Sequence, residues 1–160
     1  MAIVTIIGAG MMGSALAFPA RENGNEVRLV GTPLDRDIIE TSKKTNRHPK
    51  FNKDFPVGVK YYQVEEMETA INGADMIIGG VSSFGVDWFG DFVLPKIPSD
   101  IPVLSVTKGL WDTPEGKLLT YPERGITRYP STTARSSPPR RRPWNPASYK
   151  RKDASRCTGH

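Results

Sequence analysis

A glycine-rich turn near the start of the chain most limits what this sequence can fold into. Gly8, Gly10 and Gly13 are spaced as G-x-G-x-x-G and directly follow the apolar, β-branched run at residues 2–7. Residues 11–24 then show helical spacing and end at a glycine. A strand, this turn and a helix, in that order, are the context in which the motif binds the pyrophosphate of a dinucleotide.

Each glycine of the turn has its own physical role in such a site. Gly8 permits the tight turn, Gly10 lets the backbone approach a pyrophosphate, and Gly13 allows the helix to pack closely on the strand. The N-terminus of the helix offers unpaired N–H groups and the positive end of its dipole to the phosphates. The alternative is a glycine turn that holds no ligand.

The first 110 residues alternate between apolar strand patterns and helical patterns. Strands are expected at residues 2–7, 26–30, 57–62, 74–81 and 101–107, with helices between them at 11–24, 34–44, 64–73 and 86–97. Near-continuous apolar strands joined by helices indicate a parallel sheet covered on both faces. The sequence therefore predicts an α/β fold with a Rossmann-type, doubly wound parallel sheet. Pro19 predicts a kink or an early end of the first helix.

The end of the second strand bears on which nucleotide is bound. An acid at this place, about 20 residues after the glycines, ordinarily binds the 2′-hydroxyl of the ribose. Here the strand ends at Val30–Gly31 without one, and Thr32 and Arg36 follow. Arg36 can pair with a 2′-phosphate, so we expect use of NADP or of both NAD and NADP. The alternative is that Arg36 is a solvated helix residue.

Two segments follow the fourth and fifth strands, at the edge of the sheet where ligands bind in open α/β folds. In the first segment, Ser82, Ser83 and Phe84 are expected beside the cofactor, with Phe84 as a wall near the nicotinamide. The alternative is turn chemistry in which a serine caps the next helix. In the second, Lys108 can hold a substrate hydroxyl, carbonyl or phosphate by its charge. A surface lysine is the alternative there.

The charge of the chain is divided unevenly. Residues 1–123 carry 12 Lys and Arg against 16 Asp and Glu, whereas residues 124–160 carry 10 against one. The formal net charge of the chain is +5, and its positive sign comes wholly from the last 37 residues. That end has no apolar period and five prolines, which predicts disorder after about Glu123. Its cations and aromatic residues would suit a nucleic acid. A solvated charge run is the favoured interpretation, so a nucleic-acid partner is not expected.

Few residues suited to metal or redox chemistry are present. Cys157 is the only cysteine, and the histidines are His48 and His160, so we expect neither a disulfide within the chain nor a metal site. The uncharged residues 1–20 are interrupted by three glycines and Pro19, which argues against a signal or membrane segment. We expect a soluble, cytoplasmic protein.

Several segments together resemble the NAD(P)-dependent sn-glycerol-3-phosphate dehydrogenases, with an archaeal character, over residues 1–122. They are IIGAGMMGSALA, NGNEVRLVGT, HPKF, GVSSFGV and VTKGL. This family interconverts dihydroxyacetone phosphate and sn-glycerol 3-phosphate by hydride transfer, in glycerophospholipid metabolism. The resemblance implies that Phe84 or its neighbour lies near the nicotinamide and that Lys108 contacts the substrate. It also implies that the intact enzyme can form a homodimer. The residues that it implies for binding NAD or NADP are Gly8, Gly10, Met11, Met12 and Gly13.

The rest of the chain departs from the family. There, a glycine–proline segment and a helical substrate domain with a second lysine follow, and residues 123–160 resemble neither. We expect residues 1–122 to be the NAD(P)-binding domain and residues 123–160 a basic tail foreign to the family. A shifted reading frame, a miscalled gene or a cloning artefact would produce such a tail, and the other possibility is a real tail. The helical domain is then absent, and we expect no turnover by the fragment. The alternatives are a dinucleotide-binding module tethered to nucleic acid, or another dehydrogenase of the same fold, such as a ketopantoate reductase or a sugar-nucleotide dehydrogenase.

Overall fold

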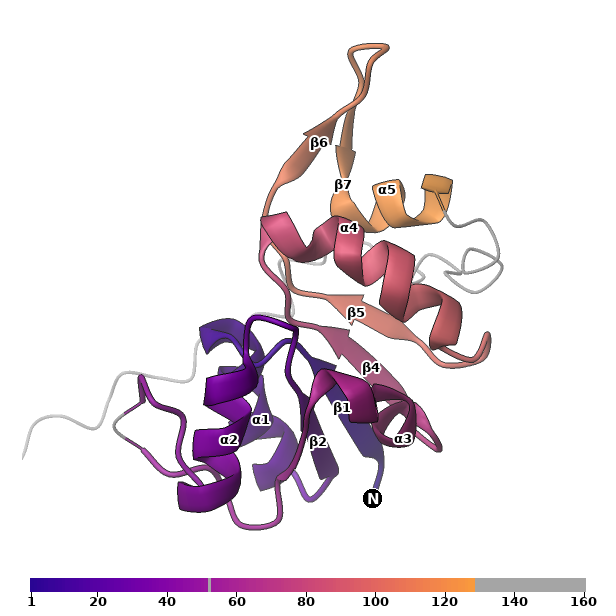
Figure 1. Ribbon diagram of the computed structural model, residues 1–160. Helices are drawn as coiled ribbons and strands as arrows, with labels where there is room; N and C mark the ends of the chain where they lie inside the picture. Colours follow the sequence, from indigo (N-terminus) through magenta and orange to yellow (C-terminus); the bar gives the residue numbers. More distant parts are fainter. Residues whose placement is uncertain (52, 129–160) are drawn as a thin grey trace, which may run out of the picture.

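The computed structural model describes residues 1–51 and 53–128, and a five-stranded parallel sheet forms its centre (Figure 1). The strand order is β3-β2-β1-β4-β5, so the chain moves outward from β1 to β3 and then returns to the other side of β1. The predicted Rossmann-type, doubly wound sheet is confirmed. The strands are β1 (Ile3–Ile7), β2 (Glu26–Val30), β3 (Lys60–Tyr62), β4 (Met76–Gly79) and β5 (Val103–Ser105).

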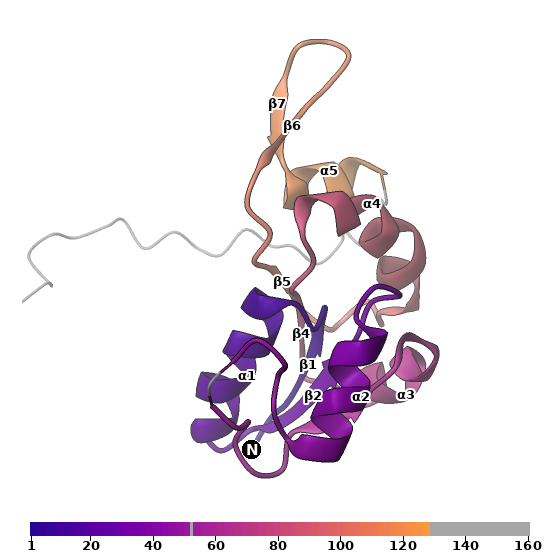
Figure 2. The same cartoon turned by 60° about the vertical axis from the view of Figure 1, so that its left-hand side comes forward.

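The helices cover both faces of this sheet. Figure 2 shows α1 and α3 on opposite sides of the strands. The fourth helical segment is irregular, because α4 is continued by a π-helical turn (Phe89–Val93) and a 3-10 turn (Leu94–Lys96). The α-helices up to this point are α1 (Met11–Glu22), α2 (Arg36–Thr45), α3 (Met67–Ile71), which follows a 3-10 turn (Val64–Glu66), and α4 (Val86–Trp88).

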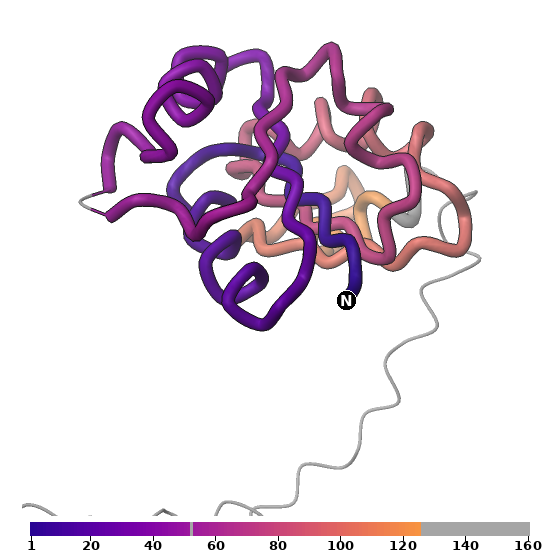
Figure 3. The backbone as a smooth tube through the Cα atoms, turned by 90° about the horizontal axis from the view of Figure 1, so that it is seen from below, coloured from indigo at the N-terminus to yellow at the C-terminus, as the bar shows by residue number. Residues whose placement is uncertain are grey.

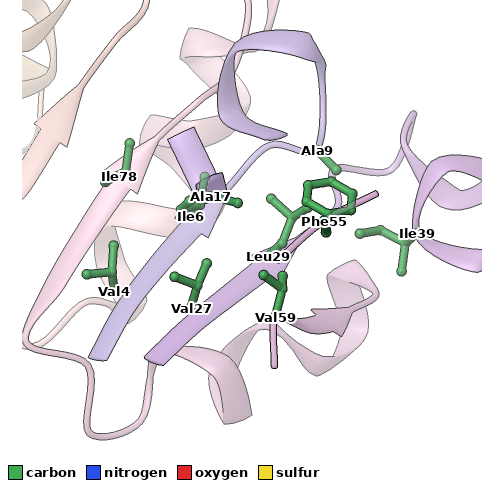
Figure 4. Close-up of a cluster of buried hydrophobic side chains, with 10 residues drawn as sticks. All are labelled: Val4, Ile6, Ala9, Ala17, Val27, Leu29, Ile39, Phe55, Val59 and Ile78. Atoms are coloured by element: carbon green, nitrogen blue, oxygen red, sulfur yellow. The ribbon is translucent and has the colours of Figure 1, made fainter. Parts of the chain in front are cut away.

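The core consists of two apolar clusters, one on each face of the sheet. Val4 and Ile6 of β1 point into the first cluster, which Figure 4 shows together with Leu29 and Phe55. Ile7 of the same strand belongs to the second cluster, beside α3 and the segment after α4. Successive side chains of a strand point to opposite faces, so a strand covered on both faces must be apolar at nearly every position. This is why the strands could be found in the sequence as continuous apolar runs.

Helix α1 continues past Pro19, so the early end expected at this residue is not observed. The chain just after the helix is held by its own polar groups. The backbone N–H and the side-chain amide of Asn23 both donate to the carbonyl of Pro19. The guanidinium of Arg21 donates to the carbonyls of Asn25 and Val57. These bonds hold the end of the helix in place despite the proline.

The third strand is shorter than expected. It covers Lys60–Tyr62 rather than residues 57–62, because Gly58 adopts a positive φ of 93° in a turn that precedes the strand. Only glycine takes up such a backbone conformation without strain. β5 is the last strand of the sheet within the described residues, and its side chains are less covered than those of β1. Val103 and Leu104 are 38% and 45% exposed.

A hairpin and a helix that the sequence did not reveal follow β5. β6 (Leu110–Asp112) pairs antiparallel with β7 (Leu118–Thr120) and projects away from the sheet, at the end opposite the N-terminus (Figures 1 and 2). In the view from below, the orange end of the described chain lies behind the indigo and magenta part (Figure 3). α5 (Tyr121–Arg128) then passes beyond Glu123, where we expected the ordered pattern to stop. The expected disorder of the basic tail otherwise concerns residues 129–160, which lie outside the described residues.

The side chain of Arg124 anchors α5 to the rest of the fold. Its guanidinium forms an ion pair with Asp87 of α4, with a distance of 2.6 Å between Nη2 and Oδ1. It also lies over the ring of Trp111 in β6, 4.6 Å from the ring centroid. One mostly buried cation thereby joins the hairpin, α5 and α4. Among the helices of residues 1–51 and 53–128, none is long and apolar enough to cross a membrane.

Replacing this cation should loosen the hairpin and α5. We expect Arg124→Met to lower the free energy of unfolding by about 1 kcal/mol, since it removes a cation–π contact and a half-exposed ion pair. Amide hydrogen exchange should become faster in β6, β7 and α5 and stay unchanged in β1. Lys44→Met, at an exposed position of α2, is the control. Equal exchange rates in both variants would contradict the anchoring role.

Candidate functional site

A cavity of about 360 Å³ opens at the carboxyl ends of β1, β2 and β4. Three loops form its walls: the glycine turn after β1, the loop between β2 and α2, and the loop between β4 and α4. This is the place in a doubly wound sheet where the strand order reverses and where ligands bind. The lining residues are Gly8, Gly10, Thr32, Pro33, Leu34, Asp35, Gly80, Val81, Ser82, Phe84, Gly85 and Trp88.

The floor of the cavity is made by three backbone segments in close contact. A Cβ on Gly13 would lie 1.9 Å from the carbonyl oxygen of Gly8, and a Cβ on Gly80 would lie 2.8 Å from the Cα of Gly13. Gly8 itself has a φ of 113°, and a Cβ there would lie 2.7 Å from the carbonyl of Gly80. β1, the first turn of α1 and the end of β4 can therefore meet only because all three residues are glycines.

Gly10 is a glycine for a different reason. Its φ of −64° is open to any residue, and a Cβ built on it would meet no protein atom within 4 Å. Neither backbone conformation nor packing inside the protein requires a glycine there. The residue lines the cavity at the N-terminus of α1, whose first turn carries no acidic side chain. A helix leaves its first N–H groups without partners, so this point suits a close anionic ligand.

Asp35 is a residue of the site that sequence reasoning missed. It lies five residues beyond the end of β2, yet its Oδ2 accepts hydrogen bonds from the backbone N–H of Ala9 at 3.1 Å and from that of Thr32 at 2.9 Å. The hydroxyl of Thr32 donates to the same oxygen at 2.7 Å. The acid thus turns back toward the glycine turn instead of capping α2. The sequence places Asp35 within the predicted helix at residues 34–44 and indicates no role for it in the site.

Thr32 and Arg36, the two residues expected near the ribose, lie in different surroundings. Thr32 lines the cavity, next to Asp35. Arg36 is not among the lining residues, and its guanidinium pairs with Glu65 on the 3-10 turn before α3. Both partners of this pair are more than half exposed. The pair lowers the pKa of the Glu65 carboxyl, mainly through the hydrogen bond from Arg36.

The loop after β4 brings an aromatic side chain to the mouth of the cavity. Ser82 and Phe84 line it, and Phe84 is 97% exposed, an unusual state for a phenylalanine ring. Ser83 is exposed and is not part of the lining. Met11 and Met12 lie at the start of α1, and more than half of each side chain is exposed. The apolar groups around this entrance suit the face of a planar ring.

Lys108 lies beyond the carboxyl end of β5 and is exposed. It is not among the lining residues, but the residue before it is tied to the cavity wall. The hydroxyl of Thr107 donates to the carbonyl of Val81 at 2.7 Å. The residue after it, Gly109, has a φ of 136°, and a Cβ there would lie 2.7 Å from the ring of Tyr121. A hydrogen bond therefore ties the residue before Lys108 to the cavity wall, and only a glycine fits at the position after it.

No group of three or more His, Cys, Asp or Glu side chains within residues 1–51 and 53–128 is placed to hold a metal ion. The site instead presents the N-terminus of α1, the glycines of the turn after β1 and an entrance with apolar side chains. Fold and site together define an NAD(P)-binding domain of the Rossmann type. The chain belongs to the family described as the NAD-dependent glycerol-3-phosphate dehydrogenase N-terminus, whose model matches residues 3–126.

Relatives of known identity agree with this assignment. The NADP(+)-dependent glycerol-3-phosphate dehydrogenase of Archaeoglobus fulgidus is 38% identical over 121 residues, which are 76% of this chain and 35% of the relative. The glycerol-3-phosphate dehydrogenase [NAD(P)+] of Shouchella clausii is 30% identical over 107 residues, or 67% of this chain and 31% of the relative. The crystal structure of the glycerol-3-phosphate dehydrogenase of Coxiella burnetii has a TM-score of 0.61 at 26% identity and covers 68% of this chain and 33% of that one. The chain thus spans about a third of the length of these proteins.

Alanine substitutions should distinguish Gly13, which packing requires, from Gly10, which packing does not require, by their effects on the free energy of unfolding. Gly13→Ala places a Cβ against the Gly8 carbonyl and should lower the free energy of unfolding by about 1–3 kcal/mol or more. Gly10→Ala meets open space and should change it by less than about 1 kcal/mol. Urea unfolding followed by circular dichroism measures both values. A Gly10→Ala variant as unstable as Gly13→Ala would show that Gly10 also serves packing.

Proposed function

We propose that this chain is the cofactor-binding domain of an NAD(P)-dependent sn-glycerol-3-phosphate dehydrogenase. The observation that carries the proposal is Gly10, whose missing Cβ is explained by no neighbour within the protein but by a ligand at the N-terminus of α1. In this arrangement Gly8, Gly10 and the N–H groups of Met11, Met12 and Gly13 hold the pyrophosphate. The adenosine ribose lies toward Thr32, and the nicotinamide lies toward Phe84, with Ser82 and Ser83 in the same loop.

The cofactor supplies or accepts the hydride, and the protein provides position and charge. Reduction of dihydroxyacetone phosphate places negative charge on the ketone oxygen, which a fixed ammonium group stabilises. Lys108 is our candidate for this group, because it follows β5 at the carboxyl edge of the sheet and its neighbour Thr107 is hydrogen-bonded to Val81 of the cavity wall. The only charged side chain that lines the cavity, Asp35, already accepts hydrogen bonds from the turn and from Thr32. Most of the binding energy for the phosphate-bearing substrate must then come from outside this domain, and the fragment alone should not turn over.

Binding of the reduced cofactor tests the proposal directly. We expect the full 160-residue chain to bind NADH or NADPH weakly in calorimetry, and Gly10→Ala to weaken this binding at least about tenfold. The added methyl group occupies the space needed by the pyrophosphate. Lys44→Met, on the surface of α2, should bind as the unaltered chain does. Equal binding by Gly10→Ala would contradict the placement of the pyrophosphate, and reduction of dihydroxyacetone phosphate by the fragment would contradict the need for further groups.

The choice between NADH and NADPH is expected to depend on Arg36. Its guanidinium is paired with Glu65 and must leave that partner to reach a 2′-phosphate. Glu65→Gln removes the competing charge and should lower the Kd of NADPH about two- to fivefold without changing that of NADH. Arg36→Ala should raise the Kd of NADPH alone. If neither variant changes the ratio of the two Kd values, Arg36 is a surface residue with no role in cofactor choice.

A further inference from the structure

The backbone of Ala9, between the first two glycines of the turn, is held from three directions, through its N–H and its carbonyl oxygen. Its N–H donates to Oδ2 of Asp35 at 3.1 Å. Its carbonyl oxygen accepts a hydrogen bond from the hydroxyl of Ser14 at 3.0 Å and lies 3.2 Å from Nε2 of His48. Ala9 is fully buried, and Figure 4 shows it on the loop that follows β1, near Phe55. The two contacts from Asp35 and His48 come from residues 26 and 39 positions away.

His48 makes its contact as a neutral imidazole. Nδ1 accepts a hydrogen bond from the backbone N–H of Lys50 at 3.1 Å, so this nitrogen carries no proton. Nε2 therefore carries the proton and donates to the carbonyl of Ala9. The ring has no exposed surface and stacks on Phe51, with 4.3 Å between the ring centroids. Both nitrogens of the neutral ring are in use, one as an acceptor and one as a donor.

Protonation of His48 cannot keep this arrangement. A proton on Nδ1 would point at the N–H of Lys50, and two donors cannot share a hydrogen bond. Burial is the main cause that lowers the pKa of His48 below its ordinary 6.5, and the charge of Lys50 adds to it, while the Ala9 carbonyl and the charge of Asp35 act in the opposite direction. Because the unfolded chain then binds the proton more readily, stability contributed by the neutral ring is complete above about pH 6.5 and decreases below it.

We propose that His48 is a positioning residue of the cofactor site: its neutral imidazole fixes the Ala9 peptide, and with it the direction in which Gly10 faces the pyrophosphate. Cofactor binding should therefore weaken when His48 takes up a proton. The inference rests on the proposed function, because it concerns the same turn. It goes further in assigning control of that turn to a residue from the loop after α2, outside the glycine motif.

A purely structural role makes a different prediction. If His48 only filled space between Ala9 and Phe51, a phenylalanine of similar size would replace it, and the protonation state of the site would not matter. His48 instead contacts the carbonyl oxygen of Ala9, the residue between Gly8 and Gly10, through Nε2. Ala9 is the single residue between Gly8 and Gly10, so a rotation of its backbone redirects the chain on both sides of it.

Cofactor binding as a function of pH distinguishes these roles. For the full 160-residue chain, we expect the Kd of NADH to rise at least about threefold between pH 7.5 and a pH at which NMR shows the His48 ring to be mostly protonated. His48→Gln keeps a donor N–H near the place of Nε2 but does not titrate, so its Kd at pH 7.5 should lie within about threefold of the unaltered value and stay flat with pH. His48→Phe should bind weakly at every pH.

The matched control is Ser14→Ala, which removes the other side-chain donor to the same carbonyl but leaves His48 in place. It should keep the pH dependence of the unaltered chain. The inference is overturned if His48→Gln shows the same rise in Kd at low pH, or if His48→Phe binds as the unaltered chain does. Circular dichroism verifies that each variant is folded, and a misfolded His48→Phe leaves His48→Gln to decide.

A second measurement needs no cofactor and keeps the inference separate from the proposed function. In the free chain, the NMR shifts of the Ala9 and Gly10 amides should change with pH along the titration curve of the His48 ring, and this change should be absent in His48→Gln. If the unaltered chain binds neither dinucleotide, the proposed function fails, and these shifts still test the link between His48 and the turn. Amide shifts that do not follow the ring would overturn the inference.

Discussion

The rest of the structure depends on the close approach of backbone at Gly8, Gly13 and Gly80. Without side chains at these three positions, α1 begins directly on the end of β1, and β4 lies against both. This contact sets where the cavity lies and directs the N-terminus of α1 into it. The apolar clusters on the two faces of the sheet then hold the strands in register around that point. The site is thus a consequence of how the sheet and its first helix pack.

The parts of the fold that local sequence determines could be predicted. Continuous apolar runs identified the parallel strands, and the spacing of the glycines identified the turn and its helix. Asp35 and His48 could not be recognised in this way, because their role is a hydrogen bond to Ala9 from 26 and 39 residues away. The hairpin was missed because β6 and β7 have three residues each and are mostly exposed, which leaves no apolar period.

The described residues are suited to binding and orienting a nucleotide, and few of them carry groups that could react with a substrate. The cavity walls are backbone, small residues and a few apolar side chains, and Asp35, the only charged side chain among them, is committed to hydrogen bonds with the turn and its neighbour Thr32. Lys108 stands apart, beyond the carboxyl end of β5, next to Thr107, whose hydroxyl donates to the carbonyl of Val81. This division agrees with a chain that spans about a third of the length of its relatives. A site that mainly binds a nucleotide needs little else from its own domain.

The partly uncovered strand β5 has a consequence for how this polypeptide behaves in concentrated solution. Within the described residues the sheet ends there, with Val103 and Leu104 only partly covered. A strand edge without a neighbour offers its N–H and C=O groups to any extended chain that meets it, and apolar side chains make such an encounter persist. In concentrated solution, β5 is therefore an edge at which another copy of this polypeptide can add a strand.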